Sequence, residues 1–202
     1  MYKLEVIFVD TNTNSLESLL SSKYLSLENK KEISRFLLEE TKKEKAASFI
    51  LKNKYIGEYH LNEFNKPISD KYEFNISHSK GVVVFIKDNT PIGIDIEKIR
   101  EVETDLIDYI SNDEEKEYIT NKEKFYEIWT NKESLVKCIG TGIVDKIKEI
   151  PSLPLNSKKE YKNKTFYSKT IKYLDYIISI SRQENKPFDI KIMEEILWNI
   201  IH

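Results

Sequence analysis

The chain has 202 residues, of which 40% are hydrophobic, 33% charged and 11% aromatic, a composition typical of a folded domain and not of a disordered segment. Its 32 basic and 34 acidic residues leave a formal net charge of −2, which argues against a uniformly basic surface for nucleic acid. All basic residues except Arg35, Arg100 and Arg182 are lysines, so phosphate recognition would depend mainly on ammonium groups.

The first half of the chain alternates between strand and helix patterns. Residues 2–9 predict a strand, and apolar residues three and four apart predict helix from residue 16 to about residue 53. Three short strands follow, at 74–77, 82–86 and 92–97. Turn-forming residues at 88–91 predict a hairpin between the last two of these strands.

The second half begins with helical patterns at about 105–121 and at 123–139, the latter ended by Gly140 and Gly142. After a polar stretch at 156–164, the remaining elements are expected to be strands at 165–173, 176–181 and 188–193 and a short helix at 194–201. This order predicts an α+β fold in which one motif could be used twice, with two closely packed halves, 1–100 and 101–202.

The location of the protein follows from three features of the sequence. A single cysteine, Cys138, excludes an internal disulfide and favours a reducing compartment. The first ten residues lack the cleavage pattern of a signal peptide. No apolar run approaches the roughly 20 residues that cross a bilayer. We therefore expect a cytoplasmic protein without a membrane partner.

Two acids share one face of the strand predicted at 92–97. In a strand, Ile92, Ile94 and Ile96 point to one face, and Gly93, Asp95 and Glu97 point to the other. The two carboxylates are about 7 Å apart at their backbones and can converge on one hard cation. The alternative is an ordinary solvent-exposed strand face, from which Asp95 could be removed with little effect on folding.

The helix predicted at 123–139 places Glu133 and Lys137 one turn apart, at the edge of an apolar stripe. An exposed surface ion pair is the alternative interpretation of these two residues. Lys132 falls near the middle of the stripe, so it must reach water or meet an acid in a partly buried place.

A strand that ends in Ser77-His78-Ser79-Lys80 offers hydroxyls, an imidazole and an ammonium, which suit an anionic ligand such as phosphate. The alternative is that His78 is a structural histidine with its hydrogen bonds satisfied inside the protein.

Three motifs together resemble the 4′-phosphopantetheinyl transferases of the Sfp type: F-N-I-S-H-S at 74–79, I-G-I-D-I-E at 92–97 and W-T-N-K-E-S-L-V-K at 129–137. Asn65-Lys66-Pro67 is similar to that family's G-K-P loop. The resemblance implies a pseudo-twofold pair of α+β halves with the active site in the cleft between them. It also implies transfer of the phosphopantetheine arm of coenzyme A to a serine of an apo acyl or peptidyl carrier protein, with release of adenosine 3′,5′-bisphosphate.

The resemblance also implies roles for individual residues. Asp95, Glu97 and Glu133 would be ligands of Mg²⁺, and Lys137 would neutralise the pyrophosphate of coenzyme A. Either Glu133 or a magnesium-bound water would take the serine proton. Residues that match nucleotide-binding positions are Lys66, Ser77 and His78. At 42–46 the chain departs from the family, which often has an arginine and a hydroxyl residue at the 3′-phosphate, and Lys45 would be the substitute.

Two other functions are compatible with these residues. The acids and Lys137 also resemble the metal site of a magnesium-dependent nuclease, although the near-neutral net charge gives little attraction for a polyanion. A non-catalytic module that binds carrier proteins is the third hypothesis, and the altered segment at 42–46 is its support. By resemblance we expect a monomer, with coenzyme A and a carrier protein as partners and no nucleic acid.

Overall fold

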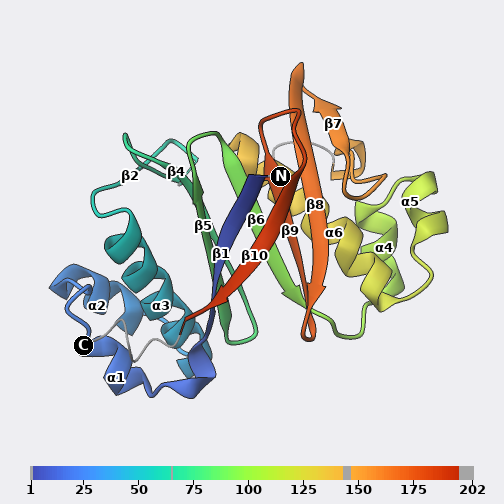
Figure 1. Cartoon of the computed structure of the whole chain (residues 1–202). Coiled ribbons are helices and arrows are strands. Elements are labelled where there is room, and N and C mark those ends of the chain that lie inside the picture. Colours follow the sequence, from blue (N-terminus) through green and yellow to red (C-terminus); the bar gives the residue numbers. More distant parts are fainter. Residues whose placement is uncertain (1, 65, 143–146, 196–202) are drawn as a thin grey trace.

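The computed structural model describes residues 2–64, 66–142 and 147–195, which form an α+β fold built on two four-stranded sheets (Figure 1). The strands are β1 (Tyr2–Asp10), β2 (His60–Leu61), β3 (Pro67–Ile68), β4 (Glu73–Ser79), β5 (Val82–Asp88), β6 (Ile92–Lys98), β7 (Lys158–Tyr161), β8 (Lys164–Tyr173), β9 (Tyr176–Arg182) and β10 (Phe188–Glu194).

The helices are α1 (Leu16–Leu20), α2 (Leu27–Ser34), α3 (Glu39–Tyr55), α4 (Thr104–Ile110), α5 (Asp113–Tyr118) and α6 (Lys122–Ile139), with 3₁₀ turns η1 (Thr11–Thr13) and η2 (Ile147–Glu149). The helix predicted at 105–121 is thus two helices, because Asn112 caps a new one with its side chain. The helix predicted at 194–201 falls largely outside the described residues. Within the described ranges, no helix has the length and apolarity that crossing a bilayer requires.

The first sheet has the strand order β10-β1-β5-β4 and the second has the order β6-β9-β8-β7. β1 pairs with β10 in parallel and with β5 antiparallel. β6 belongs to the second sheet although it precedes residue 100, and β10 belongs to the first sheet although it follows residue 100. The division into halves 1–100 and 101–202 stays a prediction, and the sheets exchange strands across that boundary.

The predicted hairpin between 82–86 and 92–97 is wrong. β5 pairs with β4 through the turn at Lys80 and Gly81, whose φ angles are 48° and 80°. Positive φ at both positions is the geometry of a tight two-residue hairpin. The turn at 88–91 instead carries the chain from the first sheet to the second, where β6 pairs with β9. β7 lies in the stretch that was expected to be an irregular link.

The core has layers in the order helix, sheet, sheet, helix. α3 packs its apolar side chains on one face of the first sheet. The opposite face of that sheet packs on the second sheet, where Ile92, Ile94 and Ile96 lie fully buried, as the alternation predicted. α6 covers the outer face of the second sheet. The face of β6 that carries Gly93, Asp95 and Glu97 is therefore turned toward α6.

α6 lies unusually close to β6 because small residues line the contact. A Cβ atom added to Gly93 would be 2.1 Å from the carbonyl oxygen of Ser134 and 2.3 Å from the backbone nitrogen of Cys138. The hydroxyl of Ser134 shares a hydrogen bond of 2.8 Å with that of Ser181, on the strand beside β6. A glycine in a strand often marks such a close approach of another backbone.

Gly93→Ala is expected to push α6 away from β6, since no real Cβ atom sits so near a backbone. The free energy of unfolding should fall by about 1–3 kcal/mol, as for other overpacked sites, and chemical denaturation measures this change. Gly57→Ala is the control for replacing a glycine, because nothing lies within 4 Å of its added Cβ, although its φ of +80° adds some strain. If Gly93→Ala caused no loss of stability, the close contact between the backbones of β6 and α6 would be contradicted.

Candidate functional site

The two sheets meet along a seam between β4 and β6, and side chains of β4 join them. Asn75, Ser77 and Ser79 alternate on β4 and face β6. The amide oxygen of Asn75 accepts a hydrogen bond of 3.0 Å from the backbone nitrogen of Ile94. Ser77 donates to Asp95 Oδ1 at 2.9 Å, and Ser79 donates to Glu97 Oε2 at 2.7 Å. Both predicted metal ligands of β6 are therefore held at the seam by hydroxyls of the other sheet.

α6 adds a lysine and a third acid to this seam. Lys137 Nζ lies 2.6 Å from Asp95 Oδ1 and 2.9 Å from Ser77 Oγ. Glu133, one turn earlier, lines the same cavity, which has a volume of about 290 Å³. The residues around this seam cavity are Ile76, Ser77, His78, Asp95, Glu97, Trp129, Glu133 and Lys137. Six residues predicted for the site are thus brought together from β4, β6 and α6.

Asp95 is only 4% exposed, because α6 covers the face of the strand on which it lies. The interpretation of 92–97 as a solvent-exposed face is therefore wrong, and the prediction that Asp95 can be removed with little effect on folding loses the exposure on which it was based. A strand pattern alone does not show whether a helix covers the polar face.

Burial, and then the charge of Asp95, raise the pKa values of Glu133 and Glu97. Burial, followed by the charge of Asp95, raises the pKa of Glu133 to about 7; the ammonium of Lys137 opposes this shift and Glu97 adds to it. Burial also raises the pKa of Glu97, against the hydrogen bond from Ser79. Perturbed acids in a cavity are typical of functional sites.

Two carboxylate oxygens of the seam cavity, Asp95 Oδ2 and Glu133 Oε1, are buried without a hydrogen-bond partner. Buried oxygens of this kind are normally satisfied, so each one needs an explanation. Hard divalent cations prefer carboxylate oxygens, and the donor types at the seam fit Mg²⁺. Within the described ranges, no three acidic, histidine or cysteine side chains are already arranged around a common metal position.

A second cavity, of about 250 Å³, shares Ile76, Glu133 and Lys137 with the first. Lys66 and Phe64, from the segment between β2 and β3, lie on its wall. Lys66 Nζ is 3.4 Å from the carbonyl oxygen of Cys138, so the end of α6 is its neighbour. Lys66 therefore lies beside the site, while Asn65 falls outside the described residues.

Lys45 is the predicted binding residue that the structure does not bring to the site. Its ammonium lies over the ring of Phe36, 5.6 Å from the ring centre, and the residue lines neither cavity. Its neighbour Glu44, which the sequence did not single out, instead contacts His78 at 3.1 Å. The proposed role of Lys45 in binding coenzyme A stays a prediction.

Lys132, predicted in the middle of the apolar stripe, is fully buried on the side of α6 toward α5 and η2. Its ammonium contacts Glu115 at 2.7 Å and donates to the carbonyl oxygens of Ile110 and Ile147 at 2.8 and 2.9 Å. Ser152 donates to the other oxygen of Glu115. The expectation that this lysine meets an acid in a buried place is confirmed.

Acids and a lysine around one cavity at the seam between two sheets are suited to holding a divalent cation and an anionic group. The model of the 4′-phosphopantetheinyl transferase superfamily matches residues 91–194. The chain therefore belongs to this superfamily. The matched range contains Asp95, Glu97, Glu133 and Lys137.

Curated relatives agree with this assignment. The chain is similar to the 4′-phosphopantetheinyl transferase gsp of Aneurinibacillus migulanus, with 36% identity over 53% of this chain and 45% of that one. It is 30% identical to the transferase ffp of Bacillus subtilis and 29% identical to the transferase Sfp of Bacillus subtilis strain 168. Both of these alignments cover 77% of this chain and 74% of the relative.

Lys132→Met is expected to lower the free energy of unfolding by about 3–5 kcal/mol, because it leaves the buried carboxylate of Glu115 without its ammonium partner. Lys116→Met is the matched control. It breaks the more exposed pair with Asp108, which solvent screens, and should leave the free energy of unfolding nearly unchanged. Chemical denaturation of both variants checks the difference, and equal losses would contradict a structural role for Lys132.

Glu133→Gln is expected to change the pH dependence of stability in the presence of a chelator. The pKa of Glu133 is raised from 4.5 to about 7, so the folded protein binds this proton more tightly than the unfolded chain does. Its contribution to stability is therefore complete below pH 4.5 and is lost as the pH rises through about 7. The variant should gain stability relative to the parent between pH 5 and 8, as measured by denaturation at a series of pH values. If the difference in unfolding free energy between the variant and the parent did not change with pH, the raised pKa of Glu133 would be contradicted.

Proposed function

We propose that the protein transfers the 4′-phosphopantetheine arm of coenzyme A to a serine hydroxyl of an apo acyl or peptidyl carrier protein and releases adenosine 3′,5′-bisphosphate. The observation that supports this most is the gathering of Asp95, Glu133 and Lys137 around one cavity at the seam. Membership of the superfamily supports the type of reaction, and the similarity to relatives named 4′-phosphopantetheinyl transferases supports the identity of the transferred group.

Attack on a phosphorus atom between two phosphates requires that negative charge on the pyrophosphate be balanced. Lys137 provides one such charge, since its side chain is 29% exposed, lines the cavity, and has its ammonium held by Asp95 and Ser77. Asp95, Glu97 and Glu133 would hold Mg²⁺, which supplies further positive charge at the pyrophosphate when it is bound.

The serine hydroxyl of the carrier must lose its proton as it attacks. In our proposal Glu133 accepts this proton, because it lines the cavity that the hydroxyl must enter. One of its oxygens has no hydrogen-bond partner within the protein and is free to accept. Ser77 and His78 line the same cavity and would contact phosphate groups of the nucleotide, with Lys66 on the wall of the adjoining cavity.

The remaining expectations also belong to this proposal: a cytoplasmic monomer that acts on coenzyme A and a carrier protein, without nucleic acid or membrane as a partner. The non-catalytic module that binds carrier proteins is an alternative to this proposal. It differs from the proposed enzyme in one measurable respect, since it would bind a carrier protein in calorimetry but not coenzyme A.

The test is to incubate the full chain with coenzyme A, Mg²⁺ and several apo carrier proteins, and to weigh the carriers. Gain of one phosphopantetheine mass is expected. A folded protein that modifies none of the carriers contradicts the proposal, and cleavage of DNA or RNA with Mg²⁺ would instead support the nuclease hypothesis.

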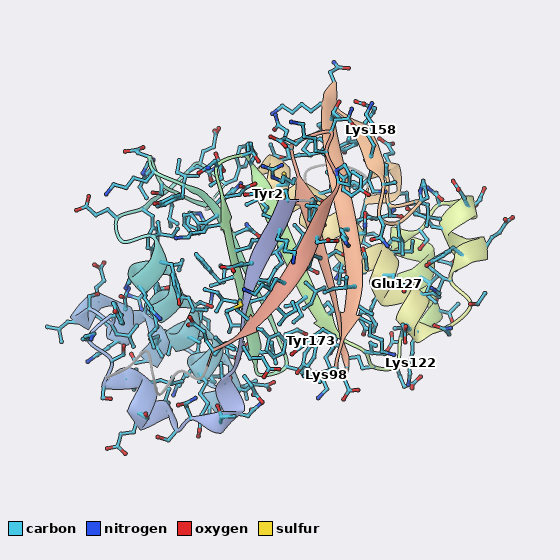
Figure 2. All side chains as sticks on the ribbon, in the orientation of Figure 1. Tyr2, Lys98, Lys122, Glu127, Lys158 and Tyr173 are labelled. Carbon is cyan, nitrogen blue, oxygen red and sulfur yellow. The ribbon has the colours of Figure 1, made fainter. Side chains whose placement is uncertain are left out.

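Asp95→Asn and Glu133→Gln should each lower the rate of transfer at least about 100-fold, the size of effect that follows loss of one group that balances charge at a reacting centre. Glu127→Gln is the matched control, because Glu127 (labelled in Figure 2) lies on the N-terminal half of the same helix and pairs with Lys124. Rates within about two-fold of one another for all three variants would contradict the assignment of the site.

A further inference from the structure

His78 presents its ring to the seam cavity from the end of β4. Its Nδ1 atom lies 3.1 Å from Glu44 Oε2, and its side chain is 39% exposed. The carboxylate behind the ring is nearly buried, with a side-chain exposure of 8%. His78 lines the cavity, whereas Glu44, which contacts its ring, does not.

Glu44 is fixed from a second side. It lies on α3, and its other oxygen, Oε1, accepts a hydrogen bond of 2.8 Å from the backbone nitrogen of Gly81. Gly81 has a φ of 80° in the turn that joins β4 to β5. Burial raises the pKa of Glu44, but the hydrogen bonds from His78 and Gly81 outweigh it and hold the pKa below its ordinary value. Glu44 is therefore an ionised group with both oxygens in use.

This arrangement determines which nitrogen of the ring carries the proton. An ionised carboxylate only accepts hydrogen bonds, so Nδ1 of His78 must be the donor to Glu44. The other nitrogen, Nε2, is then the atom left for a ligand in the cavity. A ring held at Nδ1 also loses its freedom to rotate, which reduces the entropy lost when a ligand binds.

We propose that Glu44 is a positioning residue: its carboxylate accepts from Nδ1–H of His78 and holds the ring so that, in the imidazolium form, where both nitrogens carry protons, Nε2–H donates to a phosphate group of coenzyme A in the cavity. The inference rests on the proposed function for the identity of the ligand. It assigns a role to the segment at 42–46 that differs from the expected one, since Lys45 turns toward Phe36 and the acid before it reaches the site.

The ring proton gives a test that does not depend on activity. Long-range ¹H–¹⁵N spectra of the neutral ring should show the proton of His78 on Nδ1 in the parent. In Glu44→Gln the amide keeps its oxygen for Gly81 and turns its NH₂ toward the ring, so the proton should move to Nε2. His60 is the internal reference, because it is exposed on β2. The same tautomer of His78 in both proteins would overturn the proposal.

The second readout is the binding of coenzyme A. In Glu44→Ala the KM for coenzyme A should rise about 10-fold with kcat within about two-fold, since a lost hydrogen bond to a charged group is of this size. Glu40→Gln is the matched control, because Glu40 is an exposed acid one turn earlier on α3, and its KM should equal that of the parent. An unchanged KM in Glu44→Ala would overturn the contact with phosphate.

Two further measurements distinguish failure of the proposed role of Glu44 from failure of the proposed function. Glu44→Gln retains the bond to Gly81, so it reports on the ring even where Glu44→Ala does not fold. A folded parent that neither transfers phosphopantetheine nor binds coenzyme A in calorimetry overturns the proposed function and the phosphate contact together. An unchanged tautomer alongside normal transfer overturns only the role of Glu44.

Discussion

The contact of α6 with the backbone of β6 at Gly93 is the constraint on which the rest of the site depends. Helices normally rest on the side chains of a sheet, but here the helix rests on the strand itself. Because the two backbones are so close, side chains of ordinary length suffice to bring Lys137 from the helix to Asp95 on the strand. The same closeness buries the carboxylates, and burial is the first cause of the raised pKa of Glu133.

The seam between β4 and β6 is the second condition for the site. β4 and β6 are the edge strands of two different sheets, and edges of this kind carry backbone groups that still need partners. Asn75 and Ser79 satisfy backbone nitrogens of β6 directly. Ser77, between them, binds Asp95 and Lys137 instead. The interactions that join the sheets therefore also orient the groups of the cavity.

Local periodicity predicted much of this arrangement. Period two placed the isoleucines of β6 on one face and Asp95 on the other, and helical spacing placed Lys132 inside an apolar stripe; both patterns depend only on backbone geometry. The partners of a strand depend on the whole fold, which is why turn residues at 88–91 predicted the wrong hairpin. The resemblance to the family favoured Lys45, whereas the contact of Glu44 with His78 depends on α3 lying beside the end of β4, and no local pattern contains that contact.

The parallel pairing of β1 with β10 joins the two ends of the chain. During synthesis on a ribosome, residues 188–194 are made after every residue that lines the seam cavity, so the sheet that presents Ser77 and His78 gains this strand later than the cavity residues themselves. Until then β1 keeps an open edge. A shortened polypeptide that stops before Phe188 would retain every residue that lines the seam cavity. It would lack β10, the edge strand of the sheet to which Ser77 and His78 belong.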